Sequence, residues 1–141
     1  MDFDKINSAG YLANHMARLF AKGLQERIAP IGIVLGQFPI LLELWERDGI
    51  TQKQLLAKLD IEQATIANTL NRMERDKLIR RTAHPNDARA QQIWLTEKAA
   101  MLRKPAYDAA LQQNALALSK LSPEEHLQFM RLMRTVINTM R

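Results

Sequence analysis

Apolar side chains at the start of the chain recur every three or four residues, the spacing of one face of an α-helix. Over about 4–29 they are Leu12, Met16, Leu19, Phe20 and Leu24. Pro30 cannot continue this helix. A second helix is predicted over about 36–47, and its shared apolar face consists of Phe38, Leu41, Leu42 and Trp45. Gly49 provides a stop beyond it.

The next segment predicts two short helices joined by a tight turn at 60–62. Thr51 and Gln54 form a capping box that opens the first helix. The second helix reaches about Asp76, with a core stripe of Ile66, Leu70 and Met73 and an opposite face of Ala64, Asn68, Asn71, Arg72 and Arg75. Two short helices, the second with a polar and partly basic outer face, describe a helix-turn-helix.

The apolar period then changes from 3.6 to 2, which indicates β-strands. Strands are predicted over 78–83 and 91–95, and the turn-forming residues of 84–90 make the loop between them. A hairpin directly after a helix-turn-helix is a winged helix. The predicted fold is therefore mainly α with a small β-hairpin wing.

Two further helices follow the hairpin. Thr96 can cap a helix that runs to about 119 and bends at Pro105. Ser122 and Glu125 form a second capping box, with Pro123 at the first helical position. The last helix continues to the end of the sequence.

The first and last helices exceed what a winged helix needs to fold. We assign 35–96 to a winged helix-turn-helix lobe, and 1–34 with 97–141 to a helical dimerisation region. The Met- and Leu-rich stripes of the outer helices would be partly exposed in one chain, so we expect two subunits to interleave them. Packing of both ends within one chain is the alternative.

Composition narrows the class of protein. The 141 residues are the usual size of one domain, and 47% hydrophobic with 25% charged residues is typical of a globular chain. A net charge of +5 allows a polyanion partner. The absence of cysteine excludes a disulfide scaffold, a thiolate zinc site, a Cys nucleophile and a thiol redox switch. The acidic start and the lack of a long apolar run predict a cytoplasmic protein with no membrane partner.

An ordered set of short motifs runs through about 35–100. The pieces are Leu35-Gly36-Gln37-Phe38 with Leu44-Trp45, Thr51-Gln52-Lys53-Gln54-Leu55, the run 61–70, Arg72-Met73-Glu74, Leu78-Ile79-Arg80-Arg81, Asp87-Ala88-Arg89-Ala90 and Leu95-Thr96-Glu97-Lys98. In this order and spacing the set resembles the MarR family of bacterial transcription regulators.

The resemblance implies a homodimer with two winged DNA-binding lobes that bind pseudo-palindromic operators in double-stranded DNA. It also implies a repressor that a small, often aromatic or phenolic, anion releases from DNA, and a cytoplasmic protein that is nucleoid-associated when bound. Some members of the family sense oxidants through a thiol, and the missing cysteines exclude that switch here.

The sequence departs from the family pattern at several positions. Lys77 stands where Gly is usual after the recognition helix, and in a left-handed backbone it should cost roughly 1 kcal/mol. Ala88 replaces the first of two wing arginines, Asn68 stands where Arg is frequent, and Ala99 replaces a common Gly. The changes at Asn68 and Ala88 concern the operator sequence rather than the mode of binding.

The candidate DNA-binding residues lie on the second short helix and the hairpin. Thr65, Asn68, Asn71 and Arg72 would face base edges, where Asn pairs with adenine and Arg with guanine. Arg75 is placed to bind backbone phosphate, as is the helix start at Thr51 and Gln52. Arg81 adds positive charge at the base of the wing. Arg89, held in place by Asp87, would enter a minor groove. The alternatives are a solvated helix face and an ordinary surface ion pair.

A ligand pocket is a second hypothesis. Its candidate residues are Tyr11, His15 and Arg18 of the first helix with Phe38 and Trp45 of the second, and the cationic pair would suit a carboxylate or phenolate. The alternative is that the aromatic residues are core and the polar pair is surface. His15, His84 and His126 lie far apart, so no metal site, cofactor or enzyme activity is expected.

Two classes of function remain open at this stage. The first is a dimeric, sequence-specific DNA-binding regulator. The second is a winged-helix module for protein–protein assembly without specific DNA binding. The basic face of the second short helix and Arg89 favour the regulator.

Overall fold

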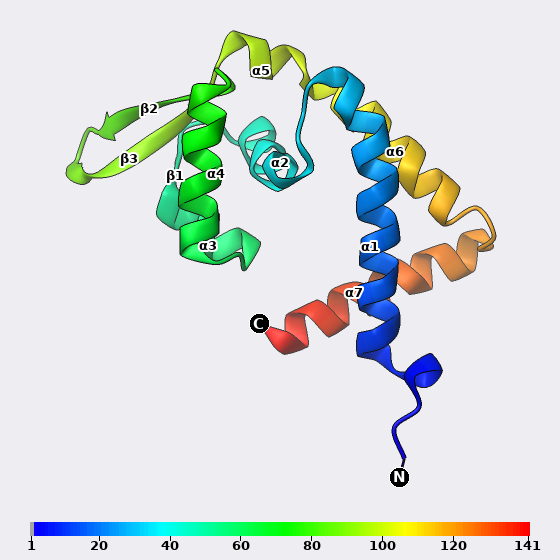
Figure 1. The fold of residues 1–141 in the computed structure, drawn as a ribbon. Helices are drawn as coiled ribbons and strands as arrows, with labels where there is room; N and C mark the ends of the chain where they lie inside the picture. Colours follow the sequence, from blue (N-terminus) through cyan, green and yellow to red (C-terminus); the bar gives the residue numbers. More distant parts are fainter. Residues whose placement is uncertain (1) are drawn as a thin grey trace.

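A lobe of short helices with a β-hairpin and a set of long outer helices make up the computed structural model, which describes residues 2–141 (Figure 1). The helices are α1 (Ala9–Ile28), α2 (Phe38–Glu46), α3 (Gln52–Leu59), α4 (Gln63–Arg75), α5 (Glu97–Met101), α6 (Arg103–Ala117) and α7 (Pro123–Met140), and the strands are β1 (Ile50–Thr51), β2 (Ile79–His84) and β3 (Asp87–Leu95). Elements α2 to β3 form the lobe, and α5 leads from it to α6, beside α1. This confirms the predicted fold class.

Helix starts are decided by local caps. α1 begins later than predicted because Ser8 caps it, with the Ser8 hydroxyl accepting the Tyr11 N–H at 3.3 Å. α2 also begins later, after a 3-10 turn over Leu35–Gln37. The predicted capping boxes that begin at Thr51 and Ser122 are both confirmed.

The core of the lobe lies where α2, α3 and α4 meet one face of the sheet. Buried side chains from these elements include Leu41, Leu44, Leu55, Ile66, Leu70, Met73 and Ile93. The predicted core stripe of α4 is therefore on its inner side. Its burial leaves the polar positions of α4 facing outward.

The sheet has three antiparallel strands in the order β1-β3-β2. β1, which pairs Ile50 with Ile93, was not predicted because two residues are too short for an alternating pattern. The hairpin is longer than predicted: residues 87–90, expected in the loop, belong to β3, and Pro85 and Asn86 alone separate the strands. Of these residues Asp87 pairs with His84, whereas Ala83 pairs with Gln91, so a register shift accommodates 88–90.

The long helix predicted after Thr96 is divided into α5 and α6 at Leu102. The bend was predicted at Pro105, but the break comes before it. Pro105 has no N–H, and its ring would clash with the carbonyl of Met101 one turn back. α5 therefore ends at Met101, and Pro105 lies in the first turn of α6, where no N–H is needed.

Helices α1 and α6 approach closely at Gly23. A Cβ atom there would lie within 2.3–2.5 Å of the Gln113 side-chain amide, so only glycine fits without a shift. Arg27 Nε donates to Gln113 Oε1 at 3.1 Å, and Arg27 Nη1 donates to Gln112 Oε1 at 3.3 Å. These contacts join the two outer helices within one chain.

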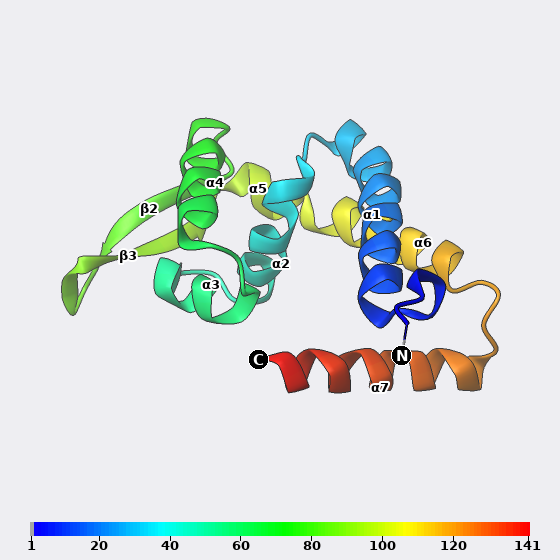
Figure 2. The same cartoon turned by 60° about the horizontal axis from the view of Figure 1, so that its bottom comes forward.

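Helix α7 crosses below α1 and points its end toward α3 (Figure 2). Arg141 Nε lies 2.9 Å from a carboxylate oxygen of Asp60, in the turn before α4. No residue of α7 is fully buried, and Leu127 is 71% and Ile137 50% exposed. The apolar face of α7 is therefore left largely uncovered by its own chain.

The described part of the chain has no single helix that is long and apolar enough to cross a membrane. The bent pair of α1 and α2, extended by their 3-10 turns and meeting at 95°, meets those criteria jointly. Much of α2 is buried in the lobe core.

Replacing Lys77 by glycine is expected to stabilise the protein. Lys77 has a φ of 60°, which is the left-handed conformation considered above because the resembling family usually has Gly at this position. Glycine adopts it without a Cβ clash, so Lys77→Gly should raise the free energy of unfolding by about 1 kcal/mol and the melting temperature by roughly 3 °C. Thermal unfolding followed by circular dichroism measures this.

Lys22→Gly is the matched control, because Lys22 is exposed within α1 and glycine there should lower the melting temperature. A Lys77→Gly protein that melts at or below the wild-type temperature would show that the left-handed backbone carries no such penalty.

Candidate nucleic-acid interface

The outward face of α4 presents the side chains predicted to reach base edges. Thr65, Asn68, Asn71 and Arg72 are all exposed. Thr69 turns inward instead and donates its hydroxyl to the Thr65 carbonyl at 2.8 Å. The structure thus brings the predicted polar residues of α4 onto one surface.

Arg75 is held near the end of this helix by its neighbour Asp76. Arg75 Nε lies 3.2 Å from Asp76 Oδ1. The hydrogen bond from Arg75, and then the one from Gln37, lower the pKa of the Asp76 carboxyl below its ordinary value of 3.8. Asp76 is therefore ionised at neutral pH and competes with any phosphate for Arg75, whose side chain is 71% exposed.

A groove of about 530 Å³ runs between the start of α3 and strand β3. It is lined by Thr51, Gln52, Lys53, Leu56, Gln63, Asp87, Ala88, Arg89, Ala90 and Gln91. The groove brings the predicted residues of α3 and of the wing together. Lys53 was missed, although its place just after Gln52 at the helix start could have indicated it.

At the start of α3, only some of the backbone N–H groups expected to bind a phosphate remain available. The Thr51 N–H donates to Gln54 Oε1 at 2.8 Å, and the Thr51 hydroxyl accepts the Gln54 N–H at 3.2 Å. Thr51 is therefore committed to capping. The next backbone N–H groups, those of Gln52 and Lys53, belong to the first turn and have no carbonyl partner within the helix.

Arg89 projects from the wing with almost no cover. Its side chain is 96% exposed, and the hairpin that carries it stands away from the lobe (Figure 1). Asp87 Oδ1 accepts the Arg89 backbone N–H at 3.0 Å, whereas the Arg89 Nε lies 3.8 Å away. Asp87 therefore holds the backbone at Arg89 and leaves the guanidinium free of a close hydrogen bond.

Arg81 differs from Arg89 because it is turned onto α4. Its Nη2 donates to Asn71 Oδ1 at 2.8 Å and to Glu74 Oε1 at 3.1 Å, and the side chain is only 18% exposed. The sequence predicted positive charge at the wing base but not these partners. Glu74 was missed because it looks like one acidic residue among alternating charges on a solvated helix.

Comparison with known proteins decides the family. The model of the MarR family matches residues 33–90. The organic hydroperoxide resistance transcriptional regulator of Bacillus subtilis is 31% identical over 134 residues, covering 95% of this chain and 90% of that protein. The chain belongs to the MarR family. It is accordingly a DNA-binding transcriptional regulator and not an enzyme.

Solved structures of MarR proteins share this fold. A MarR family regulator from Listeria monocytogenes, solved with a 26mer DNA, superposes with a TM-score of 0.88 at 21% identity, covering 94% of this chain and 89% of that one. BpsR of Bordetella bronchiseptica, whose DNA binding is regulated by 6-hydroxynicotinic acid, gives a TM-score of 0.88 at 20% identity over 96% and 97% of the two chains.

The structure brings residues of the predicted ligand pocket together only in two separate pairs, Tyr11 with His15 and Phe38 with Trp45. Trp45 is buried, and its indole N–H donates to the Ala99 carbonyl at 2.9 Å. Phe38 lines a cavity of about 610 Å³ between α1, α2 and α6. The α1 candidates, Tyr11, His15 and Arg18, are exposed and are not among its lining residues.

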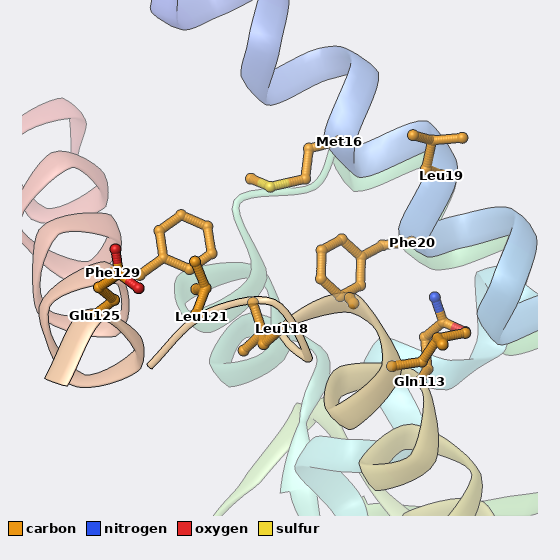
Figure 3. Close-up of a pocket in the computed structure, with 10 residues that line it drawn as sticks. Met16, Leu19, Phe20, Gln113, Leu118, Leu121, Glu125 and Phe129 are labelled. Carbon is orange, nitrogen blue, oxygen red and sulfur yellow. The ribbon is translucent and has the colours of Figure 1, made fainter. Parts of the chain in front are cut away.

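This MarR chain has a second apolar hollow, between α1, α6 and α7 (Figure 3). Its volume is about 490 Å³, and Phe20, Leu118, Leu121 and Phe129 are among the side chains around it. In residues 2–141, no group of three or more acidic or histidine side chains could hold a metal ion.

Proposed function

We propose that the chain acts as a homodimeric repressor that binds pseudo-palindromic double-stranded DNA and is released by a small aromatic anion. The observation that carries the DNA-binding mode is the outward polar face of α4 beside a projecting wing. Each α4 would enter a major groove, and each wing would place Arg89 in the adjacent minor groove.

The contacts divide by chemistry. Thr65, Asn68 and Arg72 are free to meet base edges, and Arg72 suits guanine through O6 and N7. The groove between α3 and β3 suits the phosphate backbone, because it is lined by Gln52 and Lys53 of the first turn of α3 and by Arg89 of the wing. Arg75 adds a phosphate contact when its ion pair with Asp76 breaks.

The uncovered apolar surface supports the dimer. Exposed apolar side chains of α1, α6 and α7 include Leu12, Leu19, Leu111, Leu116, Leu127, Leu132, Val136, Ile137 and Met140. The hollow next to α7 continues past Met130 and Met133 with a volume of about 620 Å³. Apolar patches of this extent mark interfaces, and a second copy of the chain supplies a surface of the same kind.

The cavity at Phe38 supports an effector site. Its walls are mostly apolar, and Gln113 and Asn114 provide polar groups. The B. subtilis relative is named for organic hydroperoxide resistance, but the 141 residues here contain no cysteine, so we favour ligand binding over thiol oxidation as the signal. We propose the bacterial cytoplasm, with nucleoid association when bound, as its location.

Arg89→Ala is expected to weaken DNA binding about tenfold without affecting folding. Arg89 makes no packing contact that the fold depends on, since its side chain is 96% exposed. Loss of a minor-groove guanidinium removes one charge-assisted contact per lobe. Electrophoretic mobility shift on the DNA upstream of the gene, at moderate salt, measures the affinity, and circular dichroism verifies the fold.

Lys120→Ala is the matched control, because Lys120 is an exposed cation between α6 and α7, far from the wing. Equal affinities of Arg89→Ala and wild type would remove Arg89 from the interface. An affinity that does not fall with rising salt, or no preference over competitor DNA, would instead support an assembly module.

A further inference from the structure

One contact in the lobe joins the wing base to the face of α4 that meets DNA. Arg81 of β2 reaches α4, where its guanidinium donates to Asn71 Oδ1 at 2.8 Å and to Glu74 Oε1 at 3.1 Å. A longer contact, 3.4 Å, runs from Arg81 Nε to Glu74 Oε2. The contact of Nε and Nη2 with Glu74 orients the planar guanidinium, and the same Nη2 also donates to Asn71 Oδ1.

The chemistry of arginine decides which end of the Asn71 amide faces it. A guanidinium has donors and no acceptor, so the atom of Asn71 that meets Arg81 has to be the carbonyl oxygen. The oxygen is therefore directed at the wing base. The amide nitrogen, Nδ2, is the group of Asn71 left to meet a base.

This orientation changes what Asn71 can recognise. A free asparagine pairs with adenine by donating to N7 and accepting from the N6 amino group, which is the role expected for Asn71 from the sequence. With its oxygen directed at Arg81, Asn71 presents the donor Nδ2 as the end of its amide that faces a base. Guanine presents two neighbouring acceptors, N7 and O6, in the major groove, whereas adenine presents N7 beside a donor.

We propose that Arg81 is a specificity-determining positioning residue, which holds the Asn71 carbonyl so that Asn71 reads guanine as a donor. The proposal rests on the proposed DNA-binding mode. Arg81 itself contacts no base; it acts through Asn71.

Selection of bound sequences from a randomised duplex library tests this with the full-length protein. Wild type is expected to enrich guanine at one position in each half-site, and Asn71→Ala to lose the preference there. Arg81→Met is expected to shift that same position from guanine toward adenine, changing the guanine-to-adenine ratio about tenfold. In the Asn71→Ala background, Arg81→Met should have no further effect at that position.

Arg80→Met is the matched control. Arg80 precedes Arg81 on β2, but its guanidinium lies over the Trp94 ring at 5.6 Å rather than on α4. Its loss should lower affinity for all sequences alike and leave base preference unchanged. Arg81→Thr suits a strand but is too short to reach Asn71, so it should shift the preference as Arg81→Met does, even where Arg81→Met unfolds.

The outcomes distinguish a failure of the proposed DNA-binding mode from a failure of the proposed role of Arg81. A wild-type protein that enriches no sequence overturns the proposed DNA-binding mode. The role of Arg81 alone is overturned if the wild type enriches a sequence but both folded Arg81 variants keep the same base preferences. It is also overturned if Asn71→Ala keeps them. As a check on the wild type itself, 7-deazaguanine at the enriched position should weaken binding, because it lacks the N7 acceptor.

Discussion

Replacing Ile137 by glutamate is expected to convert the proposed dimer into monomers and to lower DNA affinity at least 100-fold. Ile137 is 50% exposed on α7 and belongs to the same helix face as Met133 and Met140, by the 3.6-residue period. A charge on this face cannot be buried against a second copy without a partner. Loss of the dimer leaves one lobe to bind alone, and two linked lobes bind 10²–10⁴-fold more tightly than one.

Sedimentation or light scattering reports the mass, and mobility shift reports the affinity. Thr135→Glu is the matched control, because it adds the same charge two positions earlier on the opposite, exposed side of α7. It should remain a dimer with wild-type affinity. A dimeric Ile137→Glu protein would show that the uncovered face of α7 is not where two copies meet.

Trp45→Ala is expected to lower the free energy of unfolding by about 4 kcal/mol. The Trp45 ring is 6% exposed and lies edge-on between Phe38, at 6.2 Å, and Tyr107, at 5.7 Å. Removing it opens a cavity between the lobe and α6 and leaves the Ala99 carbonyl without its indole donor. Urea denaturation measures the change.

The chain's other tryptophan provides the comparison. Trp94 is only half-buried on β3, with its indole N–H on the Thr82 hydroxyl, so Trp94→Ala should cost less, about 2 kcal/mol. If Trp45→Ala keeps wild-type stability but DNA release by an aromatic anion is lost, Trp45 is a ligand residue, as the sequence first suggested, and its place in the core is incidental.

Local patterns predicted the parts of the fold that depend on neighbours in sequence. The capping boxes at Thr51 and Ser122 need only side chains three residues apart, and the core stripe of α4 follows from its 3.6-residue period. Such features arise within a few residues, so the sequence displays them directly.

Features that depend on distant partners were missed or misplaced. β1 exists because Ile50 pairs with Ile93. β3 begins as early as Asp87 because Asp87 pairs with His84 of β2 across a register shift. The break at Leu102 is different, because it follows from the ring of Pro105 and the carbonyl of Met101 only four residues apart, and the prediction placed it at Pro105 itself. For the two strands, pairing with another strand outweighed a local preference.

The sequence by itself determined that this chain is a cysteine-free winged helix with a basic, polar recognition helix and long apolar outer helices. These properties follow from residue types and their spacing. Only the tertiary structure decided how the arginines divide: Arg89 stands free at the wing, whereas Arg81 turns onto Asn71 and Glu74. It also placed Trp45 in the core. The reason is physical, because identical side chains acquire different roles from the donors, acceptors and apolar surfaces that folding brings beside them.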